Sequence, residues 1–78
     1  MPGGMKNVVG PRIREARYRG GRKVTQHELA ARLQTFGIDL DRTAISKIET
    51  GKRPVTDVEI IGVCEALGIR VSALFDED

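Results

Sequence analysis

The sequence has little of what metal sites and disulfide scaffolds are built from, with one cysteine and one histidine among its 78 residues. No disulfide can form within the chain, and there is no Cys/His set with zinc-ligand spacing. Aromatic residues make up 4% of the chain, too few for the stacking platforms that bind single-stranded nucleic acids. No apolar run resembles a signal peptide or a membrane span. We expect a cytoplasmic protein without metal, cofactor or membrane association.

The residue arrangements that carry catalysis are also missing. There is no Ser–His–acid set, and the glycine pairs Gly3-Gly4 and Gly20-Gly21 do not form a phosphate-binding loop. We interpret His27 as an exposed helix residue and Cys64 as a core residue. The sequence therefore predicts a protein that is not an enzyme.

What the chain has is positive charge, and that charge is concentrated in its first two thirds. Residues 1–54 contain twelve Lys and Arg against five Asp and Glu, whereas residues 55–78 contain one Arg against six acids. Such a split favours one face that meets a polyanion and another that points away from it. At this length the chain forms one small domain at most.

Apolar residues recur at helical spacing in four segments, without the alternation of strands. We predict a helix from Pro11 with Val9, Ile13 and Ala16 on its apolar side. The other three are expected to begin at the capping box Thr25–Glu28, at Asp41 and at the capping box Thr56–Glu59. Gly37 and Gly68 suit the left-handed ends of the second and fourth helices, the third runs to about Thr50 before Gly51, and Ser72 is expected to cap a short fifth.

The predicted fold class is all-α, a compact bundle of four to five helices. Residues 1–8 are expected to be a flexible arm, 9–75 the folded domain and 76–78 an acidic end. The residues expected inside the bundle are those at helical spacing within the capped segments: Ile13, Leu29, Ala30, Leu33, Ile45, Ile48, Ile61, Cys64 and Leu67.

The most informative segment is RTAISKIETG, residues 42–51. On a helical wheel its small and branched residues, Ala44, Ile45 and Ile48, share one side. The opposite side carries two cations and two hydroxyls and no large apolar residue: Arg42, Thr43, Ser46 and Lys47. A short helix with a buried back and a polar, cationic front suits the DNA major groove, which is wide enough for one helix.

Four pieces of the chain, in order, carry a resemblance to a known family. They are VGPRIREAR at 9–17, VTQHELAARL at 24–33, AISKIETGKRP at 44–54 and EIIGVCEALGI at 59–69. The chain resembles the phage-repressor and Cro-like helix-turn-helix domains, the Xre-type family of bacterial regulators. The resemblance implies a lambda-repressor-like bundle in which the second and third helices form the DNA-binding unit and the third enters the major groove.

The resemblance also implies roles for particular residues. Base readout falls to Arg42, Thr43, Ser46 and Lys47 on the third helix. Phosphate contacts fall to Gln26, Arg17, Thr50, Lys52 and Arg53. A salt bridge between Arg17 and Glu49 ties the first helix to the third. Three alternatives stay open: Arg42 and Lys47 contact only phosphates, Gln26 is a plain exposed residue, or Lys52 and Arg53 are solvated loop charges.

The chain departs from the family between Leu29 and Ile45, where its spacing of 16 residues is longer than usual. We expect the added length near 34–40 to lengthen the second helix and widen the turn. Phe36 is expected to share a face with Leu29 and Leu33, and Ile38 and Leu40 to turn inward, so that the segment braces the third helix. The alternative is a tolerated surface insertion.

These observations predict a sequence-specific double-stranded DNA-binding transcriptional regulator, a repressor, that binds a two-fold operator as a homodimer. The alternative is an antitoxin-like or adaptor module with the same fold, which binds a partner protein through its acidic residues 55–78. The salt dependence of DNA affinity separates the two functions.

Overall fold

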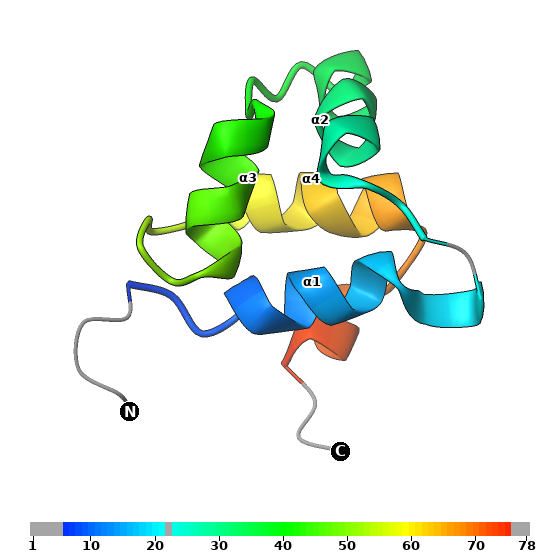
Figure 1. Cartoon of the computed structure of the whole chain (residues 1–78), viewed down its shortest axis with the longest axis horizontal. Helices are drawn as coiled ribbons and strands as arrows, with labels where there is room; N and C mark the ends of the chain where they lie inside the picture. The colour runs from blue at the N-terminus through cyan, green and yellow to red at the C-terminus, as the bar shows by residue number, and fades with distance from the viewer. Residues whose placement is uncertain (1–5, 22, 76–78) are drawn as a thin grey trace.

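The computed structural model describes residues 6–21 and 23–75. These residues form four α-helices and two short 3₁₀ helices: α1 Gly10–Arg17, η1 Arg19–Gly21, α2 Gln26–Thr35, α3 Arg42–Glu49, α4 Asp57–Leu67 and η2 Val71–Leu74 (Figure 1). No strand occurs among the described residues. The all-α prediction is confirmed.

Helices α2 and α3 stand side by side above α1 and α4, which lie roughly across them (Figure 1). Helix α3 packs on α1 and α2, while α4 packs on α2, α1 and η2. Every α-helix therefore contributes to one shared core. Among the described residues, no helix combines the length and apolar character needed to cross a bilayer.

The helix ends form largely as the sequence predicts. Thr25 and Thr56 each close a complete capping box with the Glu three residues later, and the side chain of Asp41 accepts a 2.8 Å hydrogen bond from the backbone N–H of Ala44. Gly37 and Gly68 adopt the left-handed conformation, with φ values of 78° and 69°. The fifth helix differs from the prediction: η2 is a 3₁₀ helix whose N-cap is Arg70 rather than Ser72, and no side chain caps it.

Most of the predicted core is buried, but Ile61 is a wrong prediction because half of its surface is exposed. The buried side of α4 is centred on Val63 and Cys64, with Ile60 and Leu67 partly buried beside them. At about 100° per residue, Ile61 lies well off that side. Periodicity found the apolar residues of α4 but placed Ile61 on its inward face, whereas Cys64 and Leu67 do face the core.

The long connection between α2 and α3 is folded onto the domain, although not as predicted in full. Helix α2 ends at Thr35, so Phe36 leaves the face of Leu29 and Leu33 and is 48% exposed. Leu40 is buried and Ile38 is packed against the core. The inward orientation of Ile38 and Leu40 is confirmed, and the prediction that Phe36 shares a face with Leu29 and Leu33 is wrong.

Candidate nucleic-acid interface

Helix α3 has one buried side and one solvent-facing side. Ile45 and Ile48 are buried against α1 and α2. The four side chains predicted for base readout lie on the remaining surface, where Arg42, Thr43 and Lys47 are exposed and Ser46 is half-buried. The structure therefore brings these four side chains together on the outer side of one short helix.

Arg17 and Glu49 form an ion pair inside the domain. Arg17 Nε donates to Glu49 Oε2 at 2.7 Å and Nη2 donates to Oε1 at 2.9 Å, while the side chains are 4% and 2% exposed. Arg17 Nη1 donates to the carbonyl oxygen of Val24 at 3.0 Å. The hydrogen bond to Glu49 raises the pKa of Arg17. The pair fixes the end of α3 to α1.

The guanidinium of Arg17 is directed at Glu49 and Val24, so the structure brings together the expected ion pair, while the phosphate contact of Arg17 stays a prediction. Gln26, at the first position of α2, lies at the edge of the same cluster. Its Nε2 donates to Glu49 Oε1 at 3.1 Å. Glu49 thus accepts hydrogen bonds from both side chains and holds the Gln26 amide at the half-buried start of α2.

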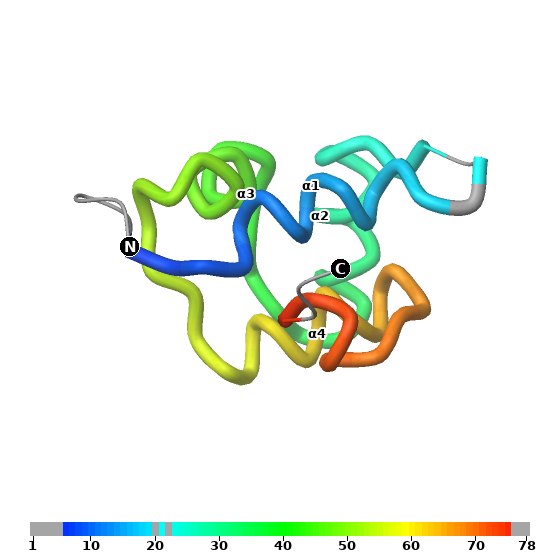
Figure 2. Tube along the Cα trace, turned by 90° about the horizontal axis from the view of Figure 1, so that it is seen from below, coloured from blue at the N-terminus to red at the C-terminus, as the bar shows by residue number. Residues whose placement is uncertain are grey.

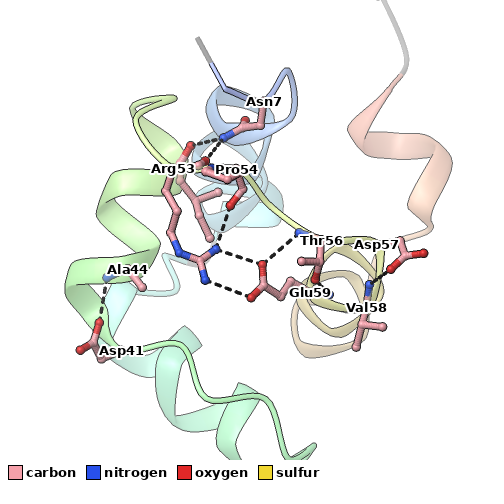
Figure 3. Close-up of polar contacts among 10 residues, drawn as sticks. Asn7, Asp41, Ala44, Arg53, Pro54, Thr56, Asp57, Val58 and Glu59 are labelled. Atoms are coloured by element: carbon pink, nitrogen blue, oxygen red, sulfur yellow. Dashed lines mark hydrogen bonds and ion pairs between the residues drawn. The ribbon is translucent and has the colours of Figure 1, made fainter. Parts of the chain in front are cut away.

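Arg53 is also engaged within the protein. Its Nη1 and Nη2 donate to the two carboxylate oxygens of Glu59 at 3.0 Å and 3.2 Å, and Nη1 donates to the carbonyl oxygen of Pro54 (Figure 3). Glu59 already serves the capping box of α4. The charge of Arg53 is therefore balanced by that of Glu59. The sequence had indicated either a phosphate contact or a solvated loop charge for Arg53, and not this ion pair.

Thr50 and Lys52 follow α3 and are both exposed. The hydroxyl of Thr50 donates to the carbonyl oxygen of Ser46 at 3.0 Å, so in this rotamer its proton is not directed at a phosphate. Lys52 forms no ion pair within the described part of the chain. Among the described residues, the ammonium group of Lys52 and the second amide hydrogen of Gln26 remain available to a phosphate, and Arg53 keeps those N–H groups that its bonds to Glu59 and Pro54 do not use.

A basic surface hollow, the Tyr18 hollow, lies between α1 and the start of α2. It is lined by Arg14, Arg17, Tyr18, Lys23, Thr25, Gln26, His27 and Arg42. The cationic groups of Arg14, Arg17 and Lys23 lie 5.8, 5.3 and 5.6 Å from the centre of the Tyr18 ring. The negative face of the ring stabilises these cations beside one another. No sequence pattern indicated Tyr18 or Lys23, because the two residues come together only through the turn after α1.

A second basic hollow, the Lys6 hollow, lies along the other side of α3. It is lined by Lys6, Asp41, Thr43, Ala44, Lys47, Lys52, Arg53 and Pro54. The sequence placed Lys6 in a flexible arm. Lys6 and Asn7 of that arm are hydrogen-bonded to the domain. Residues 1–5 of the arm and the acidic end 76–78 lie outside the described residues.

The described residues hold no group of three His, Cys, Asp or Glu that would bind a metal ion. His27 is exposed, as expected. Cys64 is buried in the core, and this burial raises the pKa of its thiol. A buried thiol with a raised pKa is a poor nucleophile.

Comparison with known proteins agrees with this geometry. A family model described as "Helix-turn-helix" matches residues 13–74. The control protein C.MunI of Mycoplasma sp. is 50% identical over 40 residues, which are 51% of this chain and 54% of that protein. The match thus spans about half the length of this curated relative.

A solved structure is similar over a larger share of the chain. The crystal structure of the restriction-modification controller protein C.AhdI from Aeromonas hydrophila superposes with a TM-score of 0.71 and 34% identity. The superposition covers 86% of this chain and 87% of C.AhdI. With most of its length matched by the family model and α2 and α3 arranged as the DNA-binding pair of the fold, the chain belongs to the helix-turn-helix family, of the phage-repressor and Cro-like, Xre type.

Proposed function

We propose that this protein is a sequence-specific double-stranded DNA-binding transcriptional regulator of the restriction-modification controller kind, acting in the cytoplasm as a repressor. The observation that carries the proposal is the outer side of α3 between two basic hollows, where Arg42, Thr43 and Lys47 are exposed and Ser46 is half-buried. Its action is binding rather than catalysis.

The chemistry of these side chains supports base readout. Arg42 and Lys47 are suited to the O6 and N7 acceptors of guanine, and Thr43 offers a hydroxyl and a methyl group to thymine. Ser46, half-buried on the same side, is suited to a shorter-range hydroxyl contact. Each good bidentate contact discriminates its base by about 1–3 kcal/mol.

The basic hollows support phosphate binding on both sides of α3. Gln26, held by Glu49 at the start of α2, offers its second amide hydrogen to a phosphate beside the Tyr18 hollow. Lys52, in the Lys6 hollow, offers the hydrogens of its ammonium group to another phosphate. Such contacts position the protein on the duplex without reading its sequence.

We further propose that the protein binds a two-fold operator as a homodimer, which is how helix-turn-helix domains commonly match a palindromic site. Val58 and Ile61 support this, because they are exposed apolar residues three positions apart on α4. Sedimentation equilibrium of the free protein and of its DNA complex measures the stoichiometry. A single chain per operator contradicts the dimer.

Selection of bound sites from a random duplex library tests the DNA-binding function, followed by affinity measurements on selected and random DNA. Arg42→Ala and Lys47→Ala are expected to relax specificity at defined base positions, at about 1–3 kcal/mol each. Lys52→Ala is expected to weaken selected and random DNA alike. No enrichment of any site, with an affinity for DNA that does not depend on salt, contradicts the function and favours binding to a partner protein.

Repression is tested separately from DNA binding. A reporter gene placed behind the selected site is expected to fall in expression when the protein is present. Arg42→Ala is expected to restore part of the expression, because the variant loses about 1–3 kcal/mol of its preference for the site. A rise in expression with the wild-type protein contradicts the repressor assignment and leaves the DNA-binding proposal intact.

A further inference from the structure

Asn7 joins the segment before α1 to the end of α3. Its Nδ2 donates to the carbonyl oxygens of Ile48 at 3.0 Å and of Arg53 at 2.8 Å. Its Oδ1 accepts a 2.7 Å hydrogen bond from the backbone N–H of Gly10. Figure 3 shows the amide of Asn7 directed at the backbone beside Arg53. With both amide hydrogens and the oxygen engaged, Asn7 has a single orientation.

This anchor determines where Lys6 lies. The backbone N–H of Lys6 donates to the carbonyl oxygen of Gly51 at 2.9 Å. In Figure 2 the first described residues run next to the loop that follows α3. The side chain of Lys6 consequently lines the same hollow as Lys47 and Lys52. Lys6 thus adds its charge to the surface of α3, although it lies 41 positions before Lys47 in the sequence.

The charge of the hollow favours a phosphate. None of the ammonium groups of Lys6, Lys47 and Lys52 forms an ion pair within residues 6–21 and 23–75. Asp41 is an acid at the rim, and its Oδ1 is occupied as the N-cap acceptor of α3. Lysine is a compact point charge with rotatable donors, suited to a phosphate oxygen in several geometries.

We propose that Lys6 and Lys52 bind one phosphodiester of the DNA backbone beside α3, and that Asn7 is the positioning residue that holds Lys6 at this site. This inference rests on the proposed function and adds a contact to it. The contact carries no base preference, so its effect lies in the strength and the salt dependence of binding.

The test measures affinity for selected and random duplexes at several salt concentrations. The logarithm of the affinity falls linearly with the logarithm of the salt concentration, and each lost phosphate contact makes this slope shallower by about 0.9. Lys6→Ala is therefore expected to reduce the slope by about 0.9 for each bound chain, and affinity at 50 mM salt should fall more than at 200 mM. The ratio of selected to random affinity is expected to stay at the wild-type value.

The matched control is Arg70→Ala, which removes the same charge from an exposed residue that lines neither basic hollow. It is expected to leave the slope unchanged. If Lys6→Ala and Arg70→Ala lower the slope equally, or neither does, the Lys6 site is overturned. Failure of the wild-type protein to bind any duplex at low salt overturns the proposed function instead, and the site falls with it.

Asn7→Ala tests the positioning role. It is expected to lower the slope by the same amount as Lys6→Ala, and the double variant is expected to lower it no further. A purely structural role predicts a different pattern: a lower melting temperature, an unchanged slope for the folded protein, and additive effects in the double variant. That pattern overturns the role of Asn7, while Lys6→Ala, whose exposed side chain is not needed for folding, still decides the site.

Discussion

Gly10, at the start of α1, lies against the carbonyl oxygen of Ile48 near the end of α3, so closely that a Cβ atom at position 10 would collide with it. Both partners are backbone, and no side-chain rotation relieves the contact. Gly10→Ala is expected to separate the two helices and to destabilise the domain by about 1–3 kcal/mol, the usual range for overpacking. Denaturant unfolding measures this, and a midpoint equal to the wild type contradicts the close approach.

Gly62 on α4 offers a contrast, since the atom that a Cβ would meet is the terminal methyl group of Ile38. Alanine favours a helix interior over glycine by about 1 kcal/mol. We expect Gly62→Ala to lose that gain while Ile38 is present, and to recover it in the Ile38→Val background, which lacks the methyl group. A double-mutant cycle measures the coupling. Additive effects would show that the two positions do not touch.

The buried pair of Arg17 and Glu49 predicts a large effect of breaking it. Arg17→Ala leaves the Glu49 carboxylate buried, with Gln26 as its one remaining side-chain donor among the described residues, and stranding a buried charge costs about 3–5 kcal/mol. Glu49→Ala is expected to cost a similar amount. Replacing both residues with apolar ones of similar volume, Arg17→Met with Glu49→Leu, should recover most of the loss. Thermal melts that change little for the single variants would contradict a structural role.

Glu59 predicts an acid-sensitive contribution to stability. Burial alone would raise the pKa of this carboxyl group, but hydrogen bonds from Arg53 and the backbone of Thr56, with the charge of Arg53, lower it overall. Because the pKa is lower in the folded state, the contribution is present above the ordinary glutamate pKa and is lost as pH falls through the folded pKa. Glu59→Gln is expected to flatten this acid limb, by less than about 1 kcal/mol for so exposed an arginine partner. Unfolding curves from pH 7 to pH 3 test it, and parallel limbs would contradict the linkage.

The connection between α2 and α3 predicts unequal effects of two apolar truncations. Leu40 is 3% exposed, so Leu40→Ala should destabilise the domain by about 2–5 kcal/mol. Phe36 is half exposed, so Phe36→Ala should cost much less. Hydrogen exchange is expected to show protection at Ile38, whose backbone N–H donates to Leu33. Fast exchange there, together with a small effect of Leu40→Ala, would indicate a loose insertion.

The features that the sequence predicted well are encoded locally. The capping boxes at Thr25 and Thr56, the cap at Asp41 and the left-handed Gly68 each need only a few neighbouring residues, and all of them form. The face of α4 was harder, because Ile60, Ile61 and Val63 are all apolar and only the packing of the other helices decides which of them is buried.

The candidate site likewise has features that neighbouring residues encode and features that depend on how distant segments pack. The outer side of α3 followed from the periodicity of eight residues. The pairing of Arg53 with Glu59 and the cations around Tyr18 depend on loop paths, and sequence patterns do not encode those paths. Lys6 was placed in a flexible arm because a segment with two glycines and a proline has no periodicity, whereas the hydrogen bonds of Asn7 beside it reach more than forty positions along the chain.

The polar ties on α3 are unevenly distributed. Near its last turn the helix is held by Asn7 on the carbonyl oxygen of Ile48 and by Arg17 and Gln26 on Glu49, all from other segments of the chain. At its first turn the cap comes from Asp41, which belongs to the connection leading into the helix. The last turn of α3 is therefore tied to three other segments of the chain, whereas the cap of its first turn comes from the connection directly before it. A substitution in the connection before α3 is accordingly expected to displace Arg42 and Thr43, at the first turn, more than Lys47, in the last turn.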